Sequence, residues 1–289
     1  MTTHRVPHLL ALVFLVWSLP ALAARCHVDA GAASATHDGQ GWATAYTDLQ
    51  DALRDATCTE VWVAQGVYVP VTPADAESWR DSVRDELVAT FDMLERRRID
   101  LPEVLRHLVD RLLAARMALI ERLDRLRLPV EGLTKTRYHG DLHFGQVLIA
   151  KKDYLIVDFE GEPSRSLAER RRKHSPLRDV AGMVRSADYA ARTVLTRLGA
   201  GAVERHTAIV DAAREWRQVV SAAFIAGYMA STRRISSVPR DADTLHALLE
   251  LFILEKALYE ARYEMDHRPD WLDVPIGGLL ELADTADGC

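Results

Sequence analysis

The sequence predicts a mainly helical α+β protein, and two observations carry that prediction. After residue 73, apolar side chains recur at three- and four-residue steps through long charged stretches, a pattern typical of amphipathic helices. Between two sets of these stretches lie two short apolar runs joined by a turn, which predict a β-hairpin. The 289 residues are enough for one large domain or two smaller ones, each with its own core.

Composition and charge exclude several classes of protein. Hydrophobic residues make up 48% of the chain and charged residues 27%, which is unlike a disordered or fibrous protein. The formal net charge of −6 provides no overall positive field, so no nucleic-acid partner is expected. The basic run at residues 169–173 is interpreted as a solvated helix surface or loop, with a phosphate-binding patch as the alternative.

Residues 1–24 predict a secretory signal peptide. His4 and Arg5 precede an apolar run that ends in the small-x-small pattern of residues 21–23. This run is shorter than the roughly 20 residues that span a bilayer, and Pro20 interrupts it. A buried N-terminal helix is the alternative interpretation, and no stable membrane span is expected.

The three cysteines leave two interpretations open. In an exported protein Cys26 and Cys58 can pair, which leaves Cys289 over; unpaired thiols without a function are the alternative. No Cys-x-x-Cys or Cys/His set has metal-ligand spacing, so a zinc site is not expected.

Residues 25–72 read as a separate, turn-rich segment. A short helix is predicted over residues 47–56, followed by a strand from Glu60 that Gly66 interrupts. The segment resembles the opening of secreted right-handed parallel β-helix proteins. Because a β-helix builds its core by stacking several coils and only about one can follow here, the domain is expected to be incomplete. The matching residues are Asp38, Gly39, Trp42, Ala45, Asp48, Leu49, Gln50, Ala52, Leu53, Val61, Trp62, Val63, Ala64, Gly66, Tyr68 and Pro70.

From Thr72 onward the sequence predicts long helices. Thr72 can cap a helix in which Pro73 occupies the first position. Its predicted buried face is Trp79, Val83, Leu87, Phe91 and Leu94. A second helix is predicted from Pro102 to just before Pro129, with Val104, Leu108, Leu112, Met117, Ile120 and Leu123 buried. Further helices are predicted over residues 180–198, 202–232 and 241–268, and the hairpin over residues 146–160.

Acidic and amide side chains at the hairpin and in the loop before it point to phosphoryl transfer. Asp141 follows a His-Gly pair, Gln146 stands five residues later, and Asp158 closes the hairpin. The protein-kinase layout places a base, an amide metal ligand and a metal-binding Asp in this order. Antiparallel pairing brings Gln146 and Asp158 to one edge, where their oxygens suit Mg²⁺. A lone His-Gly-Asp would instead be read as an Asp-capped turn.

Three further acids have two interpretations each. Glu160 and Glu162 either join the metal or substrate shell or are exposed acids after the strand. Asp179 stands at a helix start, where it either holds the backbone of the Asp141 loop or caps its own helix.

Four motifs carry a resemblance to a known kinase family: "YHGDLHFGQVL", "DFEGEP", "KHSPLRDVAGMVRS" and "LEKALYEARYEMDHRPDWLDVPIGGL". Together they resemble the maltokinase family over residues 73–282. The resemblance implies the C-terminal lobe of an aminoglycoside-phosphotransferase-like fold and the reaction of maltose with ATP and Mg²⁺ to give maltose 1-phosphate. It implies Asp141 as the catalytic base, His139 as a support of its loop, and Gln146 and Asp158 as Mg²⁺ ligands. Members are often fused to trehalose synthase of the trehalose-to-glycogen pathway, so that enzyme is an expected partner.

The last predicted helix carries the candidate sugar site. Tyr259, Glu260 and Tyr263 are expected on one helical face, with Arg262 and Trp271 close by. Aromatic side chains stack on the apolar faces of sugars while acids and Arg take the hydroxyls, so a sugar-binding wall is predicted. Core packing of the two tyrosines is the alternative.

Two functions from different classes follow. Kinases of this layout use an N-terminal lobe with a Gly-rich loop and a strand Lys, yet residues 1–72 contain no Lys and the first is Lys135. The first expectation is therefore a truncated sugar kinase, weak or inactive alone, and the second an exported binding or adhesion protein with a kinase-derived scaffold. The signal peptide favours export and the kinase motifs favour the cytoplasm, so localisation stays open and a chimeric origin is the simplest hypothesis.

Overall fold

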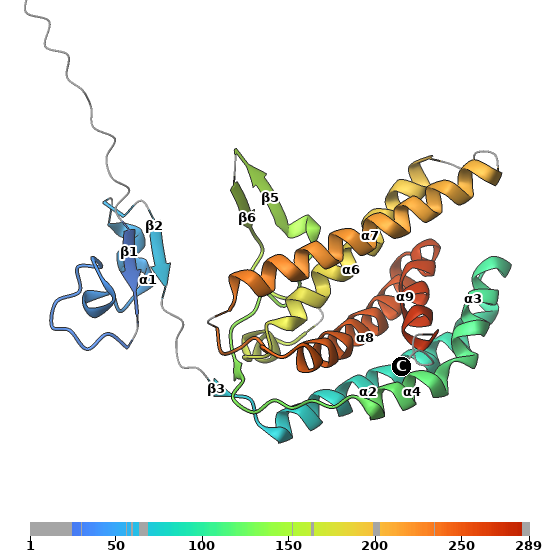
Figure 1. Cartoon of the computed structure of the whole chain (residues 1–289), viewed down its shortest axis with the longest axis horizontal. Helices are drawn as coiled ribbons and strands as arrows, with labels where there is room; N and C mark the ends of the chain where they lie inside the picture. The colour runs from blue at the N-terminus through green and yellow to red at the C-terminus, as the bar shows by residue number, and fades with distance from the viewer. Residues whose placement is uncertain are drawn as a thin grey trace, which may run out of the picture. The chain divides into compact units, whose positions relative to one another are not determined.

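A computed structural model describes residues 25–29, 31–55, 57–58, 60–63, 69–151, 153–162, 165–198, 203–233 and 235–284 (Figure 1). The predicted signal peptide, residues 1–24, lies outside the described residues. The chain divides into two compact units, Met1–Val67 and Tyr68–Cys289, and each is described by itself.

Among its described residues, the first unit contains one parallel strand pair. Strand β1 (Arg25–Val28) pairs with β2 (Glu60–Val63), and the segment between them holds the 3-10 helix η1 (Trp42–Thr44) and α1 (Leu49–Arg54). A disulfide joins Cys26 to Cys58, so the paired-cysteine alternative is confirmed. The short helix and the strand are where the sequence predicts them, whereas the resemblance to β-helix proteins stays a prediction.

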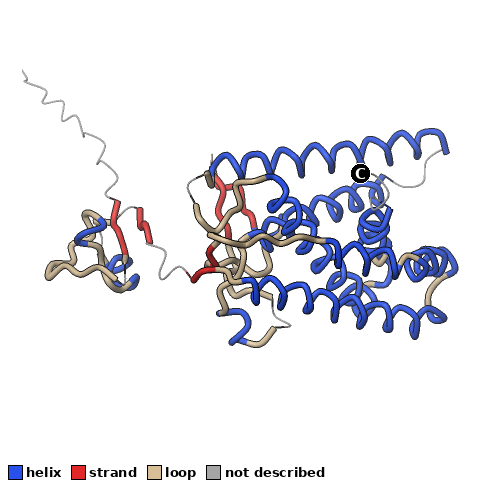
Figure 2. The backbone as a smooth tube through the Cα atoms, turned by 60° about the horizontal axis from the view of Figure 1, so that its bottom comes forward, coloured by secondary structure: helices blue, strands red, loops and turns tan. Residues whose placement is uncertain are grey.

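The second unit is a helical body with two small sheets. Figure 2 shows the helices running side by side, with the strands gathered at one end of this unit. Helix α2 (Pro73–Arg97) begins with a capping box between Thr72 and Asp75, and its five predicted core residues are all buried. It packs along α8 (Ala242–His267), which Asp241 caps.

Helices α6 (Leu177–Leu198), α7 (Val203–Ser231) and α9 (Asp273–Asp284) belong to the same body. Helix α8 packs against α6 and α9, and α6 packs against α7. Short 3-10 helices, η2 (Arg98–Asp100) and η4 (Pro269–Trp271), link the long elements. No helix among the described residues is both long enough and apolar enough to span a membrane.

The prediction of one continuous helix from Pro102 to just before Pro129 is wrong, because the structure has two helices there. The structure has α3 (Glu103–Ala114) and α4 (Arg116–Arg125), separated at Ala115, whose ψ of 2° leaves the helical region. Both helices pack on α9. Val104 and Met117, predicted to be buried, are 74% and 60% exposed. Leu112 and Leu123 are buried as predicted. Leu105, Val109 and Leu119 are buried as well, because each half turns its own face to the core.

Two antiparallel strand pairs lie at the end of the body that holds the acids. Strand β3 (Val69–Pro70) pairs with β4 (Thr134–Lys135). The predicted hairpin is present as β5 (Val147–Ala150) and β6 (Asp153–Ile156), preceded by the 3-10 helix η3 (Phe144–Gln146). A short helix, α5 (Leu167–Arg171), lies between the hairpin and α6.

Candidate active site

The loop that carries Asp141 is tied to the start of α6 by Asp179. One oxygen of the Asp179 carboxylate accepts a hydrogen bond from the His139 N–H at 2.6 Å, and the other accepts one from the Gly140 N–H at 2.9 Å. Burial raises the pKa of Asp179, while these two N–H groups favour its ionised form and oppose the rise. Asp179 lies in the first turn of α6, and these hydrogen bonds run to the loop.

His139 links the same loop to the end of the hairpin. Its Nε2 lies 2.8 Å from the Val157 carbonyl oxygen, and its Nδ1 lies 3.4 Å from the Asp141 N–H. A carbonyl oxygen can only accept, so Nε2 carries the proton and Nδ1 is the acceptor. His139 is buried, and backbone groups of the loop and of the end of the hairpin engage both of its ring nitrogens.

Close backbone contacts require glycine at three places around the loop. Gly140 has a φ of +88°, and a Cβ there would lie 3.3 Å from the Cα of Gly161, itself at +77°. On α6, a Cβ at Gly182 would lie 2.5 Å from the carbonyl oxygen of Leu142. Helix α6 therefore supports the residue that directly follows Asp141, a role that the sequence analysis missed.

The hairpin brings the two predicted metal ligands together. The Gln146 Nε2 donates a hydrogen bond to Asp158 Oδ2 at 2.9 Å. This leaves the Gln146 amide oxygen and the second Asp158 oxygen as metal ligands of the kind that Mg²⁺ prefers. This pair of oxygens fits a hard divalent cation. Asp158 is exposed and has a φ of +65°, so its backbone turns sharply at the end of the strand.

Asp141 belongs to a cluster of four side chains, here called the Asp141 cluster: Asp141, Glu162, Lys256 and Tyr259. The Lys256 Nζ lies 3.1 Å from Asp141 Oδ1 and 3.7 Å from Glu162 Oε2. The Tyr259 hydroxyl donates to Glu162 Oε1 at 2.7 Å, and Lys256 lies over the Tyr259 ring. All four residues line a small cavity of about 40 Å³. Lys256 was not predicted from the sequence, although its spacing of three from Tyr259 puts both on one face of α8.

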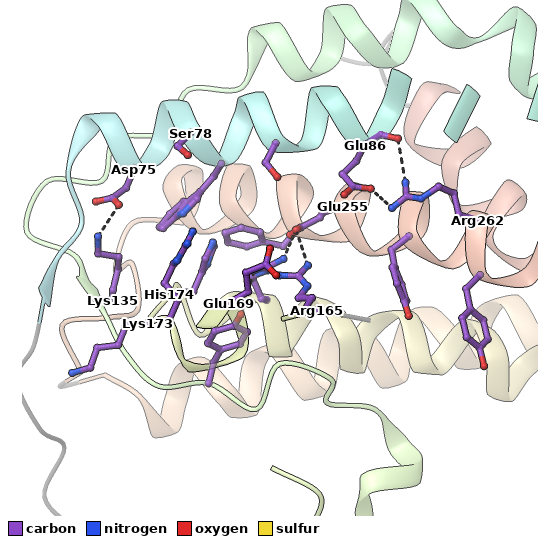
Figure 3. Close-up of a pocket in the computed structure, with 18 of the residues that line it drawn as sticks. Asp75, Ser78, Glu86, Lys135, Arg165, Glu169, Lys173, His174, Glu255 and Arg262 are labelled. Atoms are coloured by element: carbon purple, nitrogen blue, oxygen red, sulfur yellow. Dashed lines mark hydrogen bonds and ion pairs between the residues drawn. The ribbon is translucent and has the colours of Figure 1, made fainter. Parts of the chain in front are cut away.

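A larger pocket of about 610 Å³ adjoins this small cavity. Its walls are α2, α8 and the segment 165–178, and Figure 3 shows charged side chains from all three. Four ion pairs line it: Lys135–Asp75 at 2.6 Å, Arg165–Glu255 at 3.3 Å, Arg178–Glu255 and Arg262–Glu86. The two cavities share Arg165, Arg178, Phe252, Glu255 and Tyr259, so a ligand in the large pocket is next to the Asp141 cluster.

Aromatic rings line the same pocket. Trp79 stacks on His174 with ring centroids 4.4 Å apart, and Tyr263 stacks on His267 at the same distance. Burial, with help from nearby cations, lowers the pKa of His174 well below its usual value. His174 is therefore neutral at pH 7, and its ring adds no charge to the wall of the pocket.

The structure brings only part of the predicted sugar-binding wall to the pocket. Tyr259, Arg262 and Tyr263 line it. Glu260 is buried and accepts a hydrogen bond from Arg185 Nε at 2.9 Å. The prediction that it shares a helix face with the two tyrosines is therefore wrong. A helix turns about 100° per residue, which points Glu260 away from its neighbour Tyr259.

Two other predicted residues also lie elsewhere. Trp271 stacks on Tyr189, with ring centroids 6.3 Å apart, and does not line the pocket. Glu160 is exposed on the turn after the hairpin, where its carbonyl oxygen accepts a hydrogen bond from Arg170. Glu162, left open between the two interpretations, is the acid that reaches the Asp141 cluster.

Comparison with known proteins gives relatives but no matching family model. Two curated proteins, both named glucosamine kinase, are 30% identical to this chain. The one from Streptacidiphilus jiangxiensis matches 74% of this chain and 44% of its own length, and the one from Mycolicibacterium smegmatis 86% and 60%. The chain thus spans about half the length of the curated relatives it matches.

Solved structures give the same result for the fold. A glucosamine kinase in its crystal form B matches 75% of this chain and 47% of its own, with a TM-score of 0.55 and 26% identity. Another, in complex with glucosamine, ADP and inorganic phosphate, matches 74% and 46%, with a TM-score of 0.54 and 27% identity. The matched part of the chain therefore has a kinase-like fold and is related to the glucosamine kinases.

Proposed function

We propose that this chain takes part in ATP-dependent phosphoryl transfer to a sugar hydroxyl, with Asp141 as the catalytic base. The observation that carries the proposal is the position of Asp141: it lies on an anchored loop, in a small cavity that adjoins a large polar and aromatic pocket. A related kinase binds a sugar, ADP and phosphate, which supports the same class of ligands here.

In phosphoryl transfer the main task of the protein is to position the sugar hydroxyl and the phosphates. A sugar hydroxyl next to the Asp141 cluster would donate its hydrogen bond to the Asp141 carboxylate as it attacks the terminal phosphoryl group. Lys256 contacts that carboxylate from one side, and Asp179 holds the backbone of the two residues before Asp141. The rigid loop therefore holds one carboxylate oxygen at a defined place.

Gln146 and Asp158 would hold Mg²⁺, because they present an amide and a carboxylate oxygen from adjacent positions at the base of the hairpin. When bound, the ion neutralises charge on the nucleotide phosphates. ATP would be the co-substrate.

The identity of the sugar has two candidates. The motifs that resemble maltokinase favour maltose, with trehalose synthase as a partner, while the names of the relatives favour glucosamine. A pocket of about 610 Å³ is larger than one hexose ring needs, which favours the disaccharide. Tyr259 and Tyr263 line this pocket, where their rings and hydroxyls can contact a sugar.

The test is transfer of ³²P from labelled ATP with Mg²⁺ to maltose or glucosamine, separated by chromatography. The whole chain and its Asp141→Asn variant are compared, with Asp153→Asn in the hairpin turn as a charge-matched control. We expect weak labelling of the sugar by the wild type and the control and none by Asp141→Asn. Equal labelling by the wild type and Asp141→Asn would refute the assignment, and the sugar that is labelled decides the acceptor.

The disulfide favours the second candidate function, an exported binding protein. Disulfides persist in oxidising compartments, and Cys26–Cys58 is formed in the first unit. Titration of free thiols in protein isolated from its natural host, with and without reductant, tests export. A reduced Cys26–Cys58 pair in that protein would count against it.

A further inference from the structure

His174, in the segment between α5 and α6, has one ring nitrogen that is engaged and one that is not. Its backbone N–H and carbonyl oxygen exchange hydrogen bonds with Thr136 at 3.0 and 2.9 Å. The Ser175 N–H donates to Nδ1 at 2.8 Å, so Nδ1 is the acceptor and the ring proton is on Nε2. Within the part of the chain that the structure describes, Nε2 has no hydrogen-bond partner. Its N–H is therefore an available donor.

Two aromatic side chains hold the imidazole ring in one position. Trp79 of α2 stacks on it with ring centroids 4.4 Å apart, and Phe252 of α8 meets it edge to face at 5.4 Å. Both of these aromatic side chains are buried. Together with the hydrogen bond from Ser175, they leave the ring little freedom to turn. A donor held in this way binds a ligand without first losing side-chain entropy.

The available donor belongs to a wall of the larger pocket. His174 lines this pocket of about 610 Å³ and does not line the small cavity beside Asp141. Two neutral hydroxyl side chains of α2, Ser78 and Ser82, line the larger pocket as well. A polar group in such a wall needs an acceptor from water or from a ligand.

The charges around His174 suit a neutral ligand. Figure 3 shows the side chain between Lys135 and Arg165. Each of these cations is paired with an acid, Lys135 with Asp75 at 2.6 Å and Arg165 with Glu255 at 3.3 Å. The local charge is thus balanced, and the donor that is left is an uncharged N–H. A sugar hydroxyl is an acceptor that matches it.

We propose that His174 determines which sugar the pocket prefers, because its Nε2–H donates a hydrogen bond to the sugar ring that does not receive the phosphoryl group. The reacting ring has to present its hydroxyl to Asp141 in the small cavity, whereas His174 lines the larger pocket alone. The two cavities adjoin, so an acceptor with two rings, such as maltose, can extend from one into the other. A single ring held at Asp141, such as glucosamine, does not need His174. The inference rests on the proposed function for the placement of the acceptor.

The test is titration of the whole chain with maltose and with glucosamine, followed by saturation-transfer difference NMR without nucleotide. The amide of Asn falls near the place of Nδ1, so His174→Asn keeps an acceptor for the Ser175 N–H and lacks the Nε2 donor. The longer His174→Gln returns a donor to that place. His174→Phe keeps the ring stack and lacks the donor, as a second variant if the first does not fold. His107→Asn is the matched control, since the His107 side chain is 76% exposed on α3.

We expect His174→Asn and His174→Phe to bind maltose about three- to tenfold more weakly than the wild type. His174→Gln should recover most of that loss, and His107→Asn should show none. No variant should bind glucosamine less well than the wild type. Three results would overturn the inference: no binding of maltose by the wild type, equal binding by the variants without the donor, or the same loss for both sugars.

Transfer of ³²P from ATP is measured on the same proteins, so that the two proposals can fail separately. Maltose binding that depends on His174, without transfer, contradicts the proposed function alone. Transfer to maltose with a KM that His174→Asn leaves unchanged contradicts this inference alone. Because the hydroxyl that reacts is at Asp141, a raised KM with an unchanged kcat is the expected result for His174→Asn.

Discussion

Replacing Gly182 by Ala tests how closely α6 supports the Asp141 loop. The new Cβ would lie 2.5 Å from the Leu142 carbonyl oxygen, so the loop or the helix has to move by at least about 0.5 Å. Such overpacking costs about 1–3 kcal/mol. Gly227→Ala on α7 is the matched control, because a Cβ there meets nothing within 4 Å. There Ala gains up to about 1 kcal/mol from its higher helix propensity.

The assay is urea unfolding of both variants, followed by phosphate transfer at saturating ATP. We expect Gly182→Ala to be less stable than Gly227→Ala by about 1–3 kcal/mol. Both variants gain helix propensity, but only Gly182→Ala overpacks the contact with Leu142. Leu142 directly follows Asp141, so a displaced loop also slows transfer, by up to about 100-fold for a shift near 1 Å. If Gly182→Ala were as stable as Gly227→Ala, the close approach of α6 to the loop would be refuted.

Three other expected outcomes follow from the structure. Folding lowers the pKa of His174, so its contribution to stability is full above the unfolded value near 6.5 and is lost as pH falls below that value. Between pH 7.5 and 5.5 the wild type should lose up to about 1.4 kcal/mol more than His174→Asn in urea titrations. An equal loss in both would contradict the burial of this imidazole. Lys256→Met removes the cation beside Asp141 and should slow phosphate transfer at least about tenfold, whereas Lys151→Met in the hairpin turn should not; equal rates would remove Lys256 from the site. Reduction of the Cys26–Cys58 disulfide, which closes a loop of 32 residues, should destabilise the first unit by about 3–4 kcal/mol in calorimetry, and an unchanged transition would show that the unit does not depend on it.

Features with a local cause could be predicted from the sequence. The first helix of the second unit could be predicted from the capping residue Thr72, from Pro73 at its first position and from its regular apolar face. The hairpin was predictable because two apolar runs flank a short polar turn, and the pairing of Gln146 with Asp158 follows from its register. Each of these depends on residues within one element or one turn of the chain.

Features that depend on distant packing were missed. Lys256 lies 115 residues from Asp141, and only the fold brings its ammonium group to that carboxylate. Glu260 was placed with its tyrosine neighbours because Arg185, its buried partner, is 75 residues away. The break at Ala115 has no Gly or Pro to mark it, and it arises where α3 and α4 each pack on α9.

The account as a whole depends on Asp141 acting on a sugar hydroxyl in the pocket beside it. The most direct measurement is the rate of ³²P transfer from ATP to maltose and glucosamine by the whole chain, against Asp141→Asn. We predict slow transfer by the wild type to one of these sugars and a rate at least about a hundredfold lower in Asp141→Asn. Transfer at the same rate by both proteins, or binding of Mg²⁺·ATP without transfer to either sugar, would contradict it.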